Sequence, residues 1–236
     1  MTTAKRPNIL FITADQWRGD CLGRLGHGTV KTPRLDAFVE DATTFAQHFA
    51  QATPCGPARA SLHTGLYLMN HRVCRNGTPL DARRTTVALE ARRAGYDPML
   101  FGYTDQAIDP RLTTPDDPRL TTYEGLAPGY SVHTYLPDHA KPWIDWLETQ
   151  GVTATERSGD LYYPYDWDGR AGPLGPGLEP PRFSAEQTET AFLVDRFMEY
   201  ADEQGDSPWF AHMSFLRPHP PFAVPAPYNE MFDPAD

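Results

Sequence analysis

Three largely apolar segments, the first of them a continuous apolar run, mark the strands that this chain is expected to form. They lie at residues 8–13, 96–101 and 209–215, and each is followed by polar or proline-rich sequence. A run without polar alternation is typical of a strand covered on both faces, as in a parallel sheet flanked by helices. The first run therefore predicts a buried strand near the N-terminus of the chain.

Segments with helical spacing separate these strands. Thr32-Pro33 and Pro57 are typical helix starts, Gly95 and Gly205 are helix stops, and Ser184-Ala185-Glu186-Gln187 forms a capping box. The expected helices begin at Pro33 and Pro57, cover residues 86–94 and 184–204, and include a short one at 143–147. The first should pack through Leu35, Phe38, Val39 and Ala42, and the second through Ala58, Leu62 and Leu66.

The alternation of strands and helices predicts an α/β fold with a largely parallel sheet flanked by helices. Ligands of such folds bind beyond the carboxyl ends of the strands. Asp15, Tyr103, Thr104 and His219 each follow an expected strand, and Cys55 lies at an expected helix N-terminus. If the strands are neighbours, these residues meet at one edge of the sheet.

A loop-rich segment interrupts this pattern at about 105–183. It is dense in proline and glycine, and the hexapeptide at 109–114 recurs at 117–122. Two short copies cannot build a solenoid, so the repeat indicates a local loop duplication. We therefore expect one domain over residues 1–236 with a loop-rich insertion at about 105–183, of the kind that often covers a site.

Charge and cysteine content narrow the possible partners. The 236 residues carry a formal net charge of −10, which argues against binding to nucleic acid or to an anionic membrane. No apolar run reaches the length of a membrane span or a signal-peptide core. Three cysteines, an odd number, suit a reducing cytoplasm better than a disulfide scaffold. The oligomeric state stays open, a homo-oligomer included.

Cys55 is the first candidate for chemistry. Gly56 and Pro57 turn the chain so that the thiol faces the unpaired N–H groups of a helix start, where anions bind, and Arg59 lies in the same turn. A buried packing role is the general alternative for a cysteine. A thiolate phosphatase needs a longer loop than the three residues between this cysteine and arginine. A zinc site lacks a Cys-x2-Cys pair, and Cys21 and His27 are isolated.

The other candidates also have structural alternatives. Asp15 fits a turn, Tyr103 a core aromatic, Asn76 an ordinary Asn-Gly turn and His219 a rigid loop between prolines. Taken singly, Asn76 and Tyr103 favour the structural interpretation, whereas Asp15, Cys55, Arg59 and His219 favour function. We expect His63 on the surface of its helix.

Cys55-Gly56-Pro57-Ala58-Arg59 matches the Cys-x-Pro-x-Arg signature of the type I sulfatase family. The resemblance continues through residues 6–16, 32–36, 60–67 and 217–222, and it is greatest to the branch of phosphonate monoester hydrolases and phosphodiesterases. It implies an alkaline-phosphatase-like fold. It also implies a maturation enzyme that converts Cys55 to formylglycine, whose hydrate is the nucleophile.

The same resemblance implies the remaining roles. Asp15 and Gln16, together with the modified Cys55, correspond to ligands of one divalent metal ion, with Ca²⁺, Mn²⁺ or Mg²⁺ suited to hard oxygen donors. Arg59 and His219 correspond to residues that stabilise charge and protonate the leaving group. Asn76, Tyr103 and Thr104 resemble substrate-contacting positions. The implied activity is the hydrolysis of small anionic esters: phosphonate monoesters, phosphodiesters or sulfate esters.

Two departures from the family pattern matter. Gln16 stands where sulfatases have a second aspartate, which favours the phosphonate and phosphodiester branch. The family also has an Asp-His-Gly motif after a late strand, and Asp138-His139 is a poor match that we interpret as a decoy. We therefore expect an N-terminal part of a family member, truncated before the C-terminal metal-ligand strand. The alternative is a non-catalytic remnant that binds anions weakly.

Overall fold

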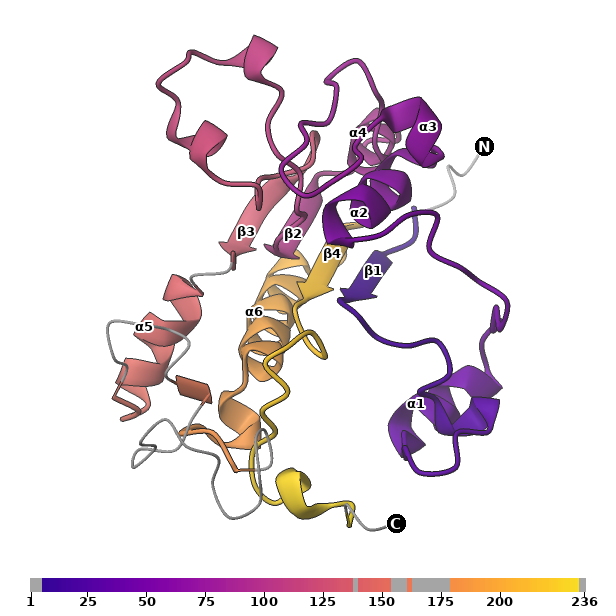
Figure 1. Ribbon diagram of the computed structural model, residues 1–236, viewed down its shortest axis with the longest axis vertical. Helices are drawn as coiled ribbons and strands as arrows, with labels where there is room; N and C mark the ends of the chain where they lie inside the picture. Colours follow the sequence, from indigo (N-terminus) through magenta and orange to yellow (C-terminus); the bar gives the residue numbers. More distant parts are fainter. Residues whose placement is uncertain (1–5, 138–139, 154–160, 163–178, 234–236) are drawn as a thin grey trace.

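A parallel sheet forms the centre of the computed structural model, which describes residues 6–137, 140–153, 161–162 and 179–233. In these residues the sheet has the order β1-β4-β2-β3, and every neighbouring pair is parallel. All the carboxyl ends therefore lie at the same edge (Figure 1). The strands are β1 (Ile9–Ala14), β2 (Pro98–Gly102), β3 (Ser131–Tyr135) and β4 (Phe210–Phe215).

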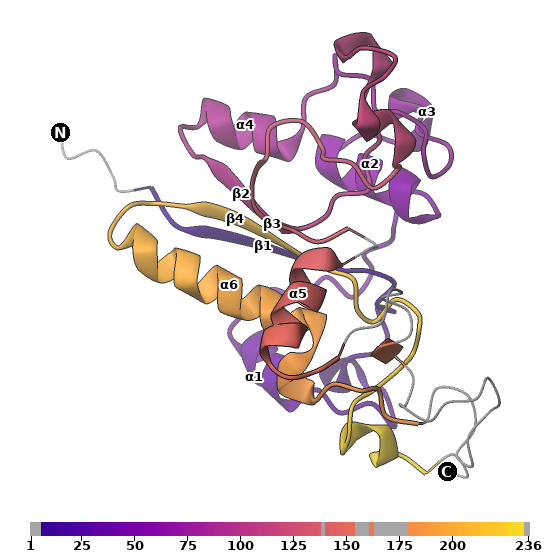
Figure 2. The same cartoon turned by 90° about the vertical axis from the view of Figure 1, so that its left-hand side faces the viewer.

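Helices lie on both sides of this sheet, which confirms the α/β prediction. Figure 2 shows α2, α3 and α4 on one side and α5 and α6 on the other. No helix in the described part of the chain combines the length and apolar character needed to cross a bilayer. The helices are α1 (Pro33–Glu40), α2 (Cys55–Thr64), α3 (Leu68–His71), α4 (Val87–Arg93), α5 (Lys141–Thr149) and α6 (Glu189–Gln204).

The apolar core lies under β2 and β4, on the side of α5 and α6. Phe101 and Ala211 are fully buried there, together with Trp143 and Leu147 of α5 and Leu193 of α6. The short helix expected at 143–147 is confirmed and is longer than predicted. β3 was missed inside the loop-rich segment, because its sequence mixes polar and apolar residues and only one of its five residues is buried.

The first apolar run forms a strand, but the prediction that it is covered on both faces is wrong. β1 is an edge strand that pairs with β4 alone. Ile12 is 53% exposed and Leu10 is 42% exposed. The expected apolar stripe of α1 is likewise unburied, and Phe38 is 71% exposed. In the described residues, then, apolar surface accumulates along β1 and α1.

Two helices begin later than expected. Thr86 lies outside α4 and caps it by accepting a hydrogen bond from the Leu89 N–H at 3.2 Å. The capping box at Ser184 also forms, but it opens a 3-10 helix over Ala185–Gln187. Thr188 then caps α6 by accepting from the Ala191 N–H. The capping box was therefore predicted correctly, but it belongs to a separate 3-10 turn that precedes α6.

The duplicated hexapeptide forms the same turn twice. In each copy the aspartate accepts a hydrogen bond from the N–H of the arginine two residues later, and the guanidinium folds back onto the same carboxylate. The copies are Asp109-Pro110-Arg111 and Asp117-Pro118-Arg119, each at the start of a 3-10 helix. This confirms the local loop duplication.

The expected apolar face of α2 is wrong, and so is its start. The helix begins at Cys55, two residues before Pro57. Leu62 is 44% exposed, whereas Arg59 and Ser61 are each 6% exposed and His63 is 1% exposed. The buried part of α2 therefore includes polar side chains beside apolar Ala60. Helical periodicity could not find it, because the method assumes that buried residues are apolar.

His63, expected on the surface, belongs to a buried aromatic cluster with Tyr130 and His212. Its ring centroid lies 5.7 Å from Tyr130 and 5.5 Å from His212. Neither ring nitrogen of His63 has a hydrogen-bond partner. Burial lowers the pKa of His63 from 6.5 to about 3, and burial also lowers that of His212. Both rings are consequently neutral in the folded protein.

These buried histidines should make the fold acid-sensitive. Below pH 6.5 the unfolded state binds protons that the folded rings exclude, so stability falls as the pH falls toward 3. His63 should cost about 1.4 kcal/mol per pH unit in that window, and the lowered pKa of His212 acts in the same direction. His63→Phe keeps the ring and removes the titration. Urea unfolding should therefore show a loss between pH 6.5 and 5 that is about 2 kcal/mol smaller in His63→Phe than in the parent protein.

The exposed residue His48 provides the control, because His48→Phe should leave this pH dependence unchanged. Equal acid sensitivity in His63→Phe and the parent would show that His63 is protonated in the folded state.

Candidate functional site

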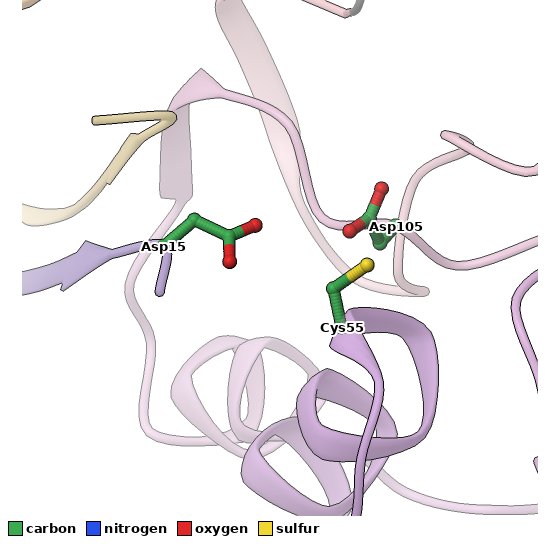
Figure 3. Close-up of side chains that lie close together, drawn as sticks. All are labelled: Asp15, Cys55 and Asp105. Carbon is green, nitrogen blue, oxygen red and sulfur yellow. The ribbon is translucent and has the colours of Figure 1, made fainter. Parts of the chain in front are cut away.

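Asp15, Cys55 and Asp105 meet at the carboxyl edge of the sheet. Asp15 follows β1, Cys55 is the first residue of α2, and Asp105 lies in the loop after β2 (Figure 3). One carboxylate oxygen of each aspartate and the Cys55 Sγ all lie within 4.8 Å of one another. The expectation that Asp15 and Cys55 come together is thus confirmed, and Asp105 is an addition that the sequence interpretation missed.

The side chain of Arg59 contacts both carboxylates of this cluster. Its Nη2 lies 3.1 Å from Asp15 Oδ2, and its Nε lies 3.4 Å from Asp105 Oδ2. Its Nη1 donates to Ser214 Oγ at 2.8 Å and to the Tyr103 carbonyl at 3.3 Å. The side chain of Arg59 is only 7% exposed. Its guanidinium connects residues that belong to, or directly follow, the strands β1, β2 and β4.

Tyr103 belongs to the same network. Its hydroxyl donates to Asp15 Oδ2 at 2.8 Å, and its ring lies under the Arg59 guanidinium with 4.4 Å between Cζ and the ring centroid. Thr104, in contrast, is fully buried. Its hydroxyl donates to the Gly125 carbonyl and accepts from the Ala127 N–H. The predicted substrate contact of Thr104 is not supported by this geometry, which assigns the side chain to holding the loop.

Asn76 forms hydrogen bonds with the turn that contains Cys55. Its Nδ2 lies 3.1 Å from the Cys55 Sγ, and its Oδ1 accepts from the Gly56 N–H at 2.9 Å. A Cβ at position 56 would lie 2.9 Å from the same Oδ1. A larger residue at position 56 would therefore displace the Asn76 side chain from this close approach. The amide of Asn76 is placed to orient whatever atom occupies the Cys55 Sγ position.

Burial sets the electrostatics of the site. It raises the pKa of the Cys55 thiol, and the charges of Asp105 and Asp15 raise it further, while the hydrogen bond from Asn76 opposes them. Burial also raises the pKa of Asp105, which Arg59 partly offsets. For Arg59 itself burial lowers the pKa, but Tyr103 and the two aspartates outweigh that effect. The thiol is thus kept protonated beside a permanent cation.

The other two candidates lie at the rim. Gln16 follows Asp15 directly, has a left-handed φ of 61° and is exposed. His219 is half-buried, and its charged form lowers the pKa of Asp105, so the ring is within electrostatic reach of the cluster. Its Nδ1 lies 2.8 Å from the Pro220 carbonyl. Asp138 and His139, interpreted as a decoy, lie outside the described residues.

The donor set fits a hard divalent cation in part. The carboxylates of Asp15 and Asp105 converge as Ca²⁺, Mg²⁺ or Mn²⁺ require, and the amide of Gln16 is adjacent in sequence. The sulfur of Cys55 is a soft ligand that suits these ions poorly. An oxygen in the place of that sulfur completes a hard donor set.

Asp105 escaped the sequence interpretation because its position depends on backbone geometry. It adopts a φ of 54°, which aspartate tolerates better than most residues, directly after the expected strand end. The available signal was its place in Tyr103-Thr104-Asp105, at the carboxyl end of a strand. An acidic residue at such an end is a candidate in its own right.

Comparisons with known proteins agree with this geometry. A family model described as "Sulfatase" matches residues 7–235. The "Multifunctional alkaline phosphatase superfamily protein PehA" of Trinickia caryophylli is 38% identical over 98% of this chain and 45% of its own length. A choline-sulfatase of Rhizobium meliloti is 27% identical over 99% of this chain and 42% of its own length.

Solved structures give the same result. The phosphonate monoester hydrolase of Agrobacterium radiobacter superposes with a TM-score of 0.92 and 55% identity, covering 98% of this chain and 45% of that one. The enzyme SpPMH of Silicibacter pomeroyi gives a TM-score of 0.89 and 42% identity, with the same coverage. The chain thus spans less than half the length of these relatives.

The electrostatic description of the site can be tested on the unmodified thiol. Asp105→Asn removes a negative charge beside Cys55, so the pKa of the thiol should fall and more thiolate should be present near pH 8. Iodoacetamide should then alkylate Cys55 at least about threefold faster, as followed by peptide mass spectrometry. Exposed Cys74 is the internal reference and Asp41→Asn the matched control. An unchanged ratio of Cys55 to Cys74 alkylation would contradict this description.

Proposed function

Because the chain belongs to the sulfatase family, we propose that it forms part of a hydrolase that cleaves small anionic esters through a formylglycine at position 55. The substrate classes are phosphonate monoesters, phosphodiesters and sulfate esters. The observation that carries the proposal is the setting of Cys55, at the start of α2 beside Asp15, Asp105 and Arg59.

The chemistry of that setting favours conversion of the cysteine. A reactive cysteine usually has a lowered pKa, because the thiolate is the nucleophile. Here burial and two carboxylates raise the pKa of Cys55. The thiol is therefore a poor nucleophile, whereas a neutral geminal diol at the same position needs no stable anion before the reaction. A formylglycine-generating maturation enzyme is the partner that this proposal requires.

The diol explains both halves of the reaction. One hydroxyl attacks phosphorus or sulfur and forms a covalent ester while the alcohol leaves. The second hydroxyl then loses its proton, its oxygen forms the aldehyde C=O, and the bond from carbon to the ester oxygen breaks. A phosphonate, a phosphate monoester or sulfate is released, according to the substrate, and the aldehyde is hydrated again. Serine at this position lacks the second hydroxyl, so it would need water to attack the adduct.

The surrounding residues have roles that follow from their contacts. Arg59 stabilises negative charge on the transferred group, Asn76 orients the nucleophilic oxygen, and His219 protonates the leaving oxygen. Asp15, Gln16 and the oxygen of residue 55 would hold the divalent cation, with Asp105 as a further donor. When bound, that cation neutralises substrate charge and lowers the pKa of the attacking hydroxyl.

A Ca²⁺-type site takes about six to eight oxygen ligands. We propose that ligands beyond these side chains come from the part of the longer relatives that this chain does not match. A chain of this length that lacked them would be a non-catalytic remnant with weak anion binding. The low and odd number of cysteines, three, is the basis on which we propose a reducing, cytoplasmic compartment.

Mass spectrometry tests the proposed modification directly. When the protein is produced with a competent maturation enzyme, the peptide containing Cys55 should lose one sulfur and two hydrogens and gain one oxygen. Cys74 and Cys21 should keep their thiols and serve as internal controls. Hydrolysis of an aryl phosphodiester by the matured protein, extended to the length of its relatives, should fall at least about 10³-fold in Cys55→Ala. A thiol at position 55 in every molecule, with undiminished hydrolysis, would refute the proposal.

Gln16 should set part of the substrate preference. Two solved relatives, 55% and 42% identical to this chain, bear the name phosphonate monoester hydrolase, and a neutral amide leaves the site with more positive charge for a phosphoryl group. Gln16→Asp adds one negative charge. We expect the ratio of kcat/KM for aryl phosphodiester over aryl sulfate to fall by about tenfold or more. Gln16→Asn is the neutral control, and an equal ratio in all three proteins would contradict the electrostatic argument.

A further inference from the structure

We propose that Arg217 and Glu189 are positioning residues that fix the loop carrying His219 and thereby the proton that His219 delivers to the leaving group; the catalytic part of this inference rests on the proposed function. Neither residue lies in the cluster around Cys55. Their contacts connect the rim of the site to α6, which lies on the other side of the sheet (Figure 2).

Arg217 holds the backbone of the loop. Its Nη1 donates to the carbonyl of His219 at 2.5 Å and to the carbonyl of Pro221 at 3.1 Å. These two acceptors flank Pro220, whose own carbonyl lies 2.8 Å from His219 Nδ1. One guanidinium group therefore fixes the carbonyls on both sides of the peptide group that orients the imidazole.

Glu189 holds Arg217 in turn. Its Oε2 lies 3.2 Å from Arg217 Nη2, and the two side chains are 6% and 21% exposed. The guanidinium also lies over the Tyr162 ring, with Cζ 4.5 Å from the centroid. A buried pair of this kind depends strongly on geometry, because loss of one partner leaves the other charge uncompensated. Lysine cannot replace the planar fork of Arg217.

The anchor at the other end is rigid. Glu189 is the first residue of α6, where the helix dipole favours a negative charge. Phe192, Leu193 and Phe197 of the same helix are buried in the main core. The position of Glu189 is thus set by the packing of the domain, and Arg217 transmits that position to the loop.

The proposed role of the loop depends on which ring nitrogen of His219 carries the proton. A carbonyl oxygen can only accept, so the contact with Pro220 requires a proton on His219 Nδ1. Nε2 is then the atom that gains and loses a proton toward the substrate. If the loop carbonyls move, this preference for one tautomer is lost and proton delivery weakens.

The test compares leaving groups in the matured, metal-loaded protein extended to the length of its relatives. A phenyl ester needs protonation of its leaving oxygen much more than a 4-nitrophenyl ester does. Glu189→Gln and Arg217→Lys should lower kcat/KM for phenyl phosphodiester by about tenfold or more, and for the 4-nitrophenyl ester by less than about threefold. Glu199→Gln makes the same substitution at an exposed site on α6 and should change neither.

A second measurement separates this inference from the proposed function. Nitrogen NMR of labelled histidine should show the Nδ1–H tautomer of His219 in the parent and a shift toward Nε2–H in Arg217→Lys and Glu189→Gln. Thermal unfolding identifies any variant that fails to fold, and the other variant then decides. Equal losses of kcat/KM for both esters, or an unchanged tautomer of His219, would overturn the proposed positioning role of Arg217 and Glu189. Hydrolysis that survives Cys55→Ala would instead overturn the proposed function and leave the tautomer result standing.

Discussion

The buried guanidinium of Arg59 is the interaction on which the rest of the site depends. It contacts Asp15 after β1, the Tyr103 carbonyl after β2 and Ser214 within β4. These groups come from three strands whose carboxyl ends must stay in register for one fork to reach them all. Removal of the cation would leave two carboxylates buried and unpaired, which costs about 3–5 kcal/mol for a buried pair. Arg59 therefore stabilises both the candidate site and the carboxyl edge of the sheet.

This requirement explains the unusual character of α2. A helix that carries Arg59 toward the sheet buries that side chain, and His63, four residues later, lies on the same face. Ser61 lies on another face, where it is paired with His71 of α3 at 2.8 Å. Among the described residues neither ring nitrogen of His63 has a hydrogen-bond partner. The buried polar residues of α2 thus include the cation that lies beside Cys55.

The sequence was sufficient for the parts of the fold that depend on local chemistry. Largely apolar segments predicted β1, β2 and β4, and helical spacing with the Gly95 stop predicted α4. It failed where burial depends on distant elements. Periodicity assumed that β1 was covered and that Leu62 was buried, and neither holds, because the sheet order and the position of Arg59 decide them.

The candidate site shows the same division. Cys55, Arg59 and Asp15 were predictable because a short motif and a strand end mark them. Asp105 and the Arg217–Glu189 pair were not, because the first depends on a left-handed backbone angle and the second on a contact between α6 and a distant loop. A backbone angle and a contact between distant segments, neither of which a short motif reveals, therefore limited the prediction of the site.

The charges of the cluster add a final constraint. Two carboxylates and one guanidinium leave one net negative charge around Cys55, in a setting where burial strengthens every charge. An anionic ester would be repelled from such a centre. The thiol cannot help, because the same charges keep it protonated. The proposed divalent cation would resolve the conflict, since it would turn the net charge positive and give both carboxylates a ligand role. A neutral diol in place of the thiol would let an oxygen, and not a sulfur, share that cation. The charges around Arg59 are thus consistent with the proposal that this edge of the sheet holds both a metal and a modified cysteine.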